Sequence, residues 1–548
     1  MSSTAKYTHV QTAEADVTTC EVPVEGIPVA TPVASQTSSR MGVATPVASQ
    51  PSSSRKGEER ADDDEISITW EKGEAQPPAF RDRWFAVAFL AQLIAVSTTG
   101  CLTASTSWGQ LFPLNNDSGS GSAYGGDGEG SPQEQAAPSH DFWAIVIGIS
   151  LLVAPALSIF SLTLMSRNAI GMITASLWFS IILCGLVALL SFFVAPPVGV
   201  IYGIFTVCLF WYAKKVKNRI PYAASNLKCS ISVLQNNLGL GLVAMGSMIG
   251  LVGYLSTWLL AFIFTINLDA MRDNNSVDND LSPLGGFVAL MFLLSFYWTH
   301  EVLRNIVRTT VSGVVGTWWF APAEATSFCS PGVRESAIRA STYSLGSIAF
   351  GSLIVAVLQL IRNTLRNAQN DRNGGILRCI AACILSYIEA LVEYFNKWAY
   401  VYVGLYGYSY IEAGKRVMNL FRSRGWNIII ADNLANRLLG IMSLTIGILT
   451  GLCTLFVSFL VDEFESKQGW LGLGFFIGFV IGILLSGIFM GLLSSAVDSV
   501  IVCYAEAPQE FNETHPELAQ EMHETWSHAW PDLGGPVIVG LGGGIGVV

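Results

Sequence analysis

The sequence predicts an all-α polytopic membrane protein of about ten transmembrane helices with a disordered N-terminal tail. Of its 548 residues, 51% are hydrophobic and only 13% are charged, whereas a soluble domain carries about 25% charged residues. Long apolar runs follow one another from residue 84 onwards, and they are too long and continuous to be strands of a membrane barrel. A bundle of transmembrane helices is the class that fits both observations.

The N-terminal segment at 1–80 is rich in Ser, Thr, Ala, Pro and charged residues and holds few large apolar ones. Such a composition cannot bury enough apolar surface to fold, so we expect a disordered cytosolic tail. The octamer VATPVASQ occurs twice in it, at 29–36 and 43–50, which indicates a low-complexity duplication. A transmembrane domain at 81–502 and a cytosolic C-terminal tail at 503–548 complete the expected organisation.

The apolar runs are long enough to cross a bilayer, which takes about 20 residues of helix. An even number of such spans returns both termini to the same side of the membrane. The ten expected spans lie near 84–105, 142–163, 169–194, 197–213, 239–268, 285–304, 342–362, 378–400, 434–461 and 470–497.

Charges between the spans set the expected orientation, because cytosolic loops are enriched in Lys and Arg. Residues 213–228 carry five basic residues and no acid, so we expect them in the cytosol. The segments at 106–141, 269–280 and 462–468 are acidic in balance and are expected outside. This orientation places both termini in the cytosol, and we expect a multi-pass protein of the cell membrane.

Two of the loops expected outside contain sequons for N-glycosylation, which begin at Asn116 and Asn274. A glycoprotein with these loops outside agrees with the charge pattern. Sequons are frequent by chance, so they add little weight of their own.

One segment departs from the charge pattern. Residues 362–378 contain Arg362, Arg366, Arg372 and Arg378, yet the alternation of spans places them outside. Three explanations stay open: the charge rule fails locally, the span at 285–320 is re-entrant, or the span at 378–411 is broken.

The stretch YFNKWAYVYVGLYG at 394–407 contains six aromatic rings, and the helix that holds it carries a polar face. A carboxylate within a span costs a few kcal/mol and tends to face a cavity or a partner. Rings attract a quaternary ammonium group by about 0.5–2 kcal/mol each, so acids and rings on one face suit an organic cation. The alternative is an interfacial aromatic belt with glycines that allow close packing. Steps of three and four place on this face Glu389, Glu393, Asn396, Tyr400, Gly404 and Gly407.

A second polar face lies in the segment at 297–320, YWTHEVLRNIVRTTVSGVVGTWWF. Glu301 precedes Arg304 by three residues, which is close enough for an ion pair on one helix. Arg304 and Arg308 alternatively mark the cytosolic edge of the span. His300 is the one histidine inside an expected span, and a hydrogen-bonding role suits it better than proton relay.

Several classes of protein are disfavoured by what the sequence lacks. It contains no GxxxxGK[ST] motif for ATP, no HExxH motif and no spacing typical of a zinc site, so we expect no enzyme, no cofactor and no metal. The basic segment at 213–228 is short and lies beside the membrane, where anionic lipid of the bilayer is its natural partner. We expect no binding of nucleic acid.

Four stretches resemble the choline transporter-like family, and together the resemblance covers about residues 84–530. At 388–400, IEALVEYFNKWAY matches the family pattern at Glu389, Asn396 and Tyr400, whereas Lys397 replaces Arg. The segment at 297–320 and the stretch CYAEAPQEFNETHPELAQEM are similar to the fungal-type, pH-nine-sensitive branch. The other matching stretch is GSIAFGSLIVAVLQLIR at 346–362.

The resemblance implies a ten-helix transporter of choline or a related amine, with both ends in the cytosol. We therefore predict facilitative or exchange transport of a small organic cation such as choline. The alternatives are a non-transporting membrane scaffold, a lipid-organising protein, or a transporter of a different small solute. The candidate binding residues are Trp298, Tyr400 and Tyr406 as a cage of rings, and Glu301 or Glu389 as the partner of the charge. For Glu301, an ion pair between helices that involves Arg304 is the alternative role.

Overall fold

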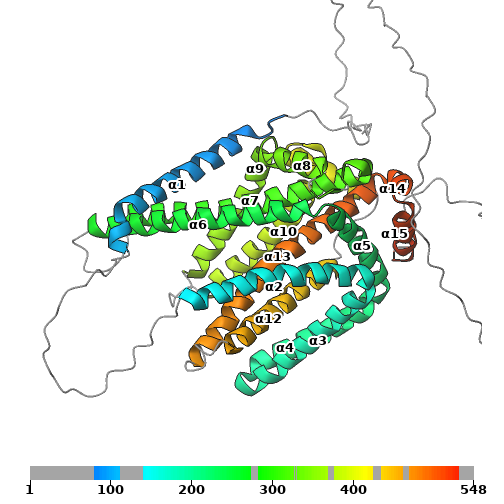
Figure 1. The fold of residues 1–548 in the computed structure, drawn as a ribbon, viewed down its shortest axis with the longest axis horizontal. Coiled ribbons are helices and arrows are strands. Elements are labelled where there is room, and N and C mark those ends of the chain that lie inside the picture. The colour runs from blue at the N-terminus through cyan, green and yellow to red at the C-terminus, as the bar shows by residue number, and fades with distance from the viewer. Residues whose placement is uncertain are drawn as a thin grey trace, which may run out of the picture. The chain divides into compact units, whose positions relative to one another are not determined.

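The structure, a computed structural model, describes residues 79–111, 140–272, 282–325, 327–328, 330–367, 375–423, 434–460 and 468–529. These residues form helices and no strand (Figure 1), which confirms the predicted all-α class. The expected tail up to residue 78 and the sequons at Asn116 and Asn274 lie outside the described residues.

Ten long helices correspond to the ten expected spans. By length and composition, nine of the helices in the described ranges could cross a membrane. The tenth, α10, is not among them, and it carries Glu389, Glu393 and Lys397. The long helices are α1 (Arg83–Leu111), α2 (His140–Arg167), α3 (Ala169–Val194), α4 (Pro196–Val216), α6 (Gly239–Arg272), α7 (Pro283–Phe320), α9 (Leu345–Asn367), α10 (Gly375–Tyr406), α12 (Leu434–Leu460) and α13 (Gln468–Glu506).

The ends of several helices follow from local sequence. Asn168 caps α3 because its side chain accepts a hydrogen bond from the Gly171 amide at 3.0 Å, and Ser282 caps α7 in the same way. Pro196 opens α4 at a position where a missing N–H costs nothing. Only Ala195 separates α3 from α4, so these two helices form a tight hairpin.

Shorter helices gather toward one end of the long ones (Figure 1). Pro, Ser and charged residues occur in most of them, and none is long enough to cross a bilayer. They are α5 (Ile220–Asn236), α8 (Pro331–Ser341), α11 (Tyr410–Ser423), α14 (Pro508–Thr514) and α15 (Pro516–Ala529), with 3₁₀ turns at Lys217–Arg219 and Pro322–Glu324.

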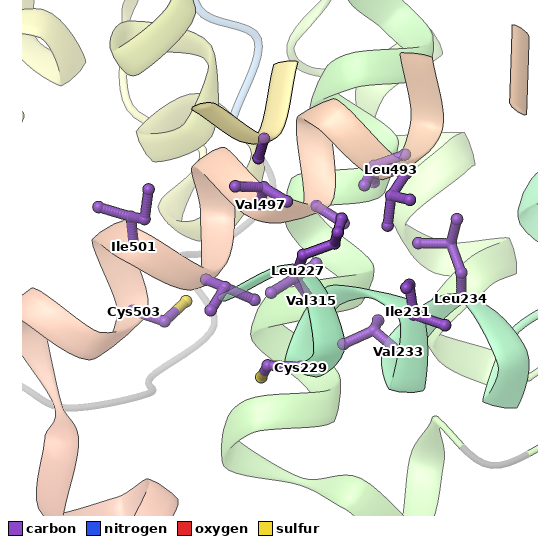
Figure 2. Close-up of a cluster of buried hydrophobic side chains, with 14 of the residues drawn as sticks. Leu227, Cys229, Ile231, Val233, Leu234, Val315, Leu493, Val497, Ile501 and Cys503 are labelled. Carbon is purple, nitrogen blue, oxygen red and sulfur yellow. The ribbon is translucent and has the colours of Figure 1, made fainter. Parts of the chain in front are cut away.

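Helix α5 is buried in the bundle, although the sequence suggested only a basic loop at 213–228. Basic residues cluster before the helix, and Lys228 lies at its middle, but twelve of its seventeen residues are buried. Its apolar face packs against α13, and residues of α5, α7 and α13 belong to the same largest core cluster (Figure 2). The labelled side chains there are Leu227, Cys229, Ile231, Val233 and Leu234 of α5, Val315 of α7, and Leu493, Val497, Ile501 and Cys503 of α13.

The segment at 507–529, which we call the C-terminal clasp, packs against the bundle. The predicted boundary at 502 falls inside α13, which continues to Glu506. After it, the Trp319 indole of α7 donates a hydrogen bond to the Ala507 carbonyl at 2.9 Å and stacks on the Phe511 ring at 4.0 Å. The first half of the clasp is thus fixed to the end of α7.

The second half of the clasp, α15, packs against α5. The Trp526 indole donates to the Asn226 side-chain oxygen at 3.1 Å, and Lys228 forms an ion pair with Glu521 at 2.5 Å. Trp526 and Asn226 are both buried, so the polar atom of each is satisfied by the other. The clasp therefore joins α5, α7 and α13.

The described residues of the basic segment at 362–378 belong to the end of α9 and the start of α10. Helix α7 is continuous over 38 residues, so it is not re-entrant. The segment at 378–411 is broken, as one of the explanations expected: α10 ends at Tyr406, Gly407 has a φ of 67° that glycine readily adopts, and α11 begins at Tyr410. The charge of Arg362 is also compensated, because Arg362 binds Glu389 of α10 at 2.5 Å.

Candidate functional site

A polar cavity of about 290 Å³ lies between α7, α9, α10 and α12. Its volume is close to the lower limit of small-molecule pockets, about 300 Å³. Asn436 on its wall is the third residue of α12, so the cavity lies toward the end of the bundle at which α12 begins. The lining residues are Glu301, Arg304, Asn305, Arg308, Val355, Ala390, Glu393, Tyr394, Asn396, Lys397 and Asn436.

Glu301 is the most enclosed acid of the cavity wall, with 4% of its side chain exposed. The Arg304 guanidinium and the Gln359 amide each donate a hydrogen bond to its Oε1 at 3.3 Å. The His300 ring nitrogen Nδ1 lies 3.6 Å from the same oxygen. These contacts hold the carboxylate in place and compensate its charge within the bundle.

Lys397 is compensated in a similar way from the other side of the cavity. Its ammonium group lies 2.7 Å from the carboxylate of Asp498 on α13, and both side chains are largely buried. The ammonium also lies over the Trp398 ring, 4.6 Å from its centroid. This pair links α10 to α13 directly beside the polar lining.

Two charged residues that line the cavity belong to neither of these ion pairs. Within the described part of the chain, neither Arg308 nor Glu393 makes an ion pair or a side-chain hydrogen bond. Glu393 is exposed at the mouth of the cavity beside Tyr394, whereas Arg308 is only partly exposed. The cavity therefore presents one acid and one base that are open to a ligand.

A second cavity of about 480 Å³ lies on the other side of α7, between α6, α7 and α13. Its wall is mostly apolar, with Met248, Leu251 and Ile488 among the lining residues. Arg304 and Arg308 line both cavities. Both arginines therefore border cavities of the bundle, and their placement at the cytosolic edge of the span stays a prediction.

The sequence-predicted residues are distributed over four places. Glu301 lines the polar cavity, and the other four do not. Trp298 and Tyr400 are buried between α7, α9 and α10: the Trp298 indole donates to the Ala349 carbonyl at 2.9 Å, and the Tyr400 hydroxyl donates to the Ile348 carbonyl at 3.2 Å. Their polar atoms are thus satisfied inside the protein.

Tyr406 is the last residue of α10, whereas Glu389 lies near the middle of this helix. The Tyr406 ring packs between those of Tyr402 and Tyr408, with centroids 5.4 and 5.8 Å away. Glu389 is occupied by Arg362. The structure does not bring the three predicted rings together into one cage in the described conformation.

Glu393 was expected on the polar face of its helix but was not predicted as a binding residue, although it lines the cavity. Arg308, Asn436 and Asp498 were not predicted as site residues either. The step of four from Glu389 through Glu393 to Lys397 is a signal that was available in the sequence. Asp498 gave no comparable signal, because its partner Lys397 lies on another helix.

A family model described as plasma-membrane choline transporter matches residues 200–509. The chain belongs to the choline transporter-like family. All lining residues of the polar cavity fall inside the matched range. Membership of this transporter family supports a membrane transporter-like role, and with the apolar helices it supports a multi-pass membrane protein.

The similar curated proteins point to a fungal branch of the choline transporter-like family. Protein PNS1 of Mycosarcoma maydis is 30% identical over 350 residues, which are 61% of this chain and 63% of that protein. Protein PNS1 of Gibberella zeae is 30% identical over 345 residues, 60% of this chain and 62% of that protein. The chain thus spans less than two thirds of these two relatives. Protein PNS1 of Eremothecium gossypii is 28% identical over 471 residues, 83% of this chain and 82% of that protein.

Proposed function

We propose that this protein carries choline or a related organic cation across a membrane by facilitative or exchange transport. The observation that carries the proposal is the open carboxylate of Glu393 beside the Tyr394 ring in a polar cavity of a transporter-family bundle. We further propose the cell membrane as its location, with both termini in the cytosol, from the charge pattern of the loops.

Glu393 and Tyr394 supply the two interactions that a quaternary ammonium group uses. The carboxylate attracts the positive charge over several ångströms in the low dielectric of a bundle. The ring adds a cation–π contribution of about 0.5–2 kcal/mol. Glu301 contributes less to the charge of an empty cavity, because Arg304 and His300 already surround it.

The five residues predicted from sequence differ in this proposal in how directly they can contact the cargo. Glu301 forms part of the cavity wall and orients Arg304. Trp298 and Tyr400 pack behind the wall, so they reach the cargo only when α7, α9 and α10 move relative to one another during alternating access. Glu389 and Tyr406 also reach the cargo only after such a movement, because they lie on α10 before and after its cavity-lining residues.

The alternative of a non-transporting scaffold predicted a bundle without a polar cavity. The cavity between α7, α9, α10 and α12 speaks against that alternative. A different small solute as the cargo is an outcome that the experiment below can reveal.

The test is uptake of labelled choline into proteoliposomes that contain the purified full-length protein. We expect uptake that saturates, that unlabelled choline and ethanolamine inhibit, and that Glu393→Gln reduces about tenfold per molecule, because a charge-assisted contact is lost. Glu335→Gln is the matched control, since it neutralises an exposed acid of α8 away from the cavity. Absence of choline uptake by the wild type, or equal uptake by Glu393→Gln, would contradict the proposal.

A further inference from the structure

We propose that Arg308 forms an anion subsite in the polar cavity, so that the preferred cargo is a small zwitterion with a quaternary ammonium group and a carboxylate. This inference rests on the proposed transport function and narrows its substrate class. It follows from the charges that remain open in the cavity once every ion pair of its described wall is taken into account.

The wall contains three bases and two acids. Arg304 is paired with Glu301, and Lys397 is paired with Asp498 behind the wall. These two pairs leave Arg308 and Glu393, which belong to α7 and α10. The cavity therefore does not present only negative charge to a simple cation, because one unpaired charge of each sign remains on its wall.

The two acids whose charges act on Arg308 from within the described bundle are Asp498 and Glu301. Each already holds a basic partner, at 2.7 Å and 3.3 Å respectively. An arginine stays ionised in proteins, and a partly buried guanidinium without a hydrogen-bonded anion is costly. Its planar group of donors matches a carboxylate in two-point geometry, and this is the ligand chemistry that Arg308 lacks.

A simple cation such as choline satisfies only one side of this arrangement. Its ammonium group would be attracted by Glu393, but it would add a positive charge to a cavity in which Arg308 remains open. A trimethylammonium carboxylate places its ammonium group at Glu393 and Tyr394, and its carboxylate at Arg308. Such a ligand leaves both open charges of the wall compensated, which is the condition that buried charges require.

The experiment measures the dissociation constants of choline and trimethylglycine for purified full-length protein in lipid nanodiscs. We expect wild-type protein to bind trimethylglycine at least as tightly as choline. Arg308→Gln should weaken trimethylglycine about tenfold or more, and it should tighten choline, because a like charge is removed. Arg308→Lys should retain part of the affinity for trimethylglycine, since it keeps the charge and loses the two-point geometry.

Two controls keep the result interpretable. Arg422→Gln removes a guanidinium from an exposed position of α11, and we expect it to change neither constant. The melting temperature of each variant reports whether the bundle is intact. Tight binding of choline with weak binding of trimethylglycine, or equal changes of both constants in Arg308→Gln, overturns this inference and leaves choline transport standing.

A free anion is the other source of the same chemistry, and replacement of chloride by gluconate tests it. If choline binding requires chloride in the wild type but not in Arg308→Gln, the subsite takes a separate anion and the zwitterion is overturned. If the wild type neither binds nor transports choline but binds trimethylglycine, the zwitterion is supported and choline as the cargo is overturned. If it binds neither compound, the proposed function fails together with this inference.

Discussion

Lys397 of α10 and Asp498 of α13 form an ion pair of 2.7 Å in which the two side chains are 17% and 3% exposed. The pair connects the one long described helix that is too polar to qualify as a span by composition with one of the most apolar helices. It also forms the back of the polar cavity through Lys397.

We expect Asp498→Asn to lower the free energy of unfolding by about 3–5 kcal/mol, because it leaves the Lys397 ammonium buried without a counter-charge. The double variant Lys397→Met/Asp498→Leu should regain most of the loss, since apolar groups of similar size often replace a buried ion pair without penalty. Thermal unfolding of purified protein in one detergent measures both. Equal losses in the single and double variants would show that the pair is not the cause.

Variants of the Arg362–Glu389 pair can distinguish a structural role of Glu389 from a role in cargo binding. We expect Glu389→Gln to lower the melting temperature, because the Arg362 guanidinium loses its partner at 2.5 Å. Arg362→Gln/Glu389→Gln should restore part of the stability. Uptake of labelled choline per molecule is the second measurement: if it falls in the single variant and stays low in the double variant, Glu389 contacts the cargo, as the sequence alone predicted.

The long helices could be predicted from sequence because each one needs only its own run of apolar residues. All ten expected spans coincide with described helices to within a few residues at most ends, although α7, α10 and α13 continue well past the predicted ends. Burial of α5 was not predictable from its own sequence. Its polar residues, such as Ser225 and Asn226, are accommodated by Thr525 and Trp526, which lie about 300 residues away along the chain.

The binding residues were only partly predictable for a related reason. A helical period shows which side chains share a face, so the pairing of Glu301 with Arg304 was predicted correctly. It does not show which face meets a cavity and which is filled by a neighbour. Trp298 and Tyr400 have side chains suited to a cation cage. In the structure they instead donate hydrogen bonds to the Ala349 and Ile348 carbonyls of α9, which the sequence of their own helices does not indicate.

The C-terminal clasp should loosen in acid. The His515 ring lies 3.9 Å from the Trp318 ring, and burial lowers the pKa of His515 from its usual value. The unfolded segment therefore takes up a proton at a higher pH than the folded one. Stability is fully present above about pH 6.5, falls as the pH drops through that value, and levels off below the folded pKa.

We expect the melting temperature of the wild type to fall more between about pH 8 and about pH 5 than that of His515→Gln, which cannot take up this proton. His528→Gln, at an exposed position of the same segment, is the matched control. Identical pH profiles of wild type and His515→Gln would rule out this histidine as a source of acid sensitivity.

The N-terminal tail should be dispensable up to residue 78 but not beyond. Asp82 lies just before α1, and its carboxylate accepts hydrogen bonds from the Ser347 hydroxyl at 2.7 Å and the Tyr410 amide at 3.2 Å. We expect deletion of residues 1–78 to leave choline uptake per molecule unchanged. Asp82→Ala should lower the free energy of unfolding by about 1–3 kcal/mol, because the buried Ser347 hydroxyl is left unpaired.

Uptake assays and thermal unfolding of the two variants test this boundary. Abolished uptake after deletion of residues 1–78 would assign a transport role to this segment. An unchanged melting temperature in Asp82→Ala would show that the chain before α1 does not fasten α9 to α11.

The charges of α10 have a consequence for biosynthesis. A segment with Glu389, Glu393 and Lys397 enters lipid poorly by itself, since each ionised residue at the helix centre costs about 2.5–3.5 kcal/mol on the translocon scale. Arg362 leaves the ribosome before α10, whereas Asp498 emerges only after α12. We therefore expect α10 to insert stably only after its last partner, Asp498, has been made.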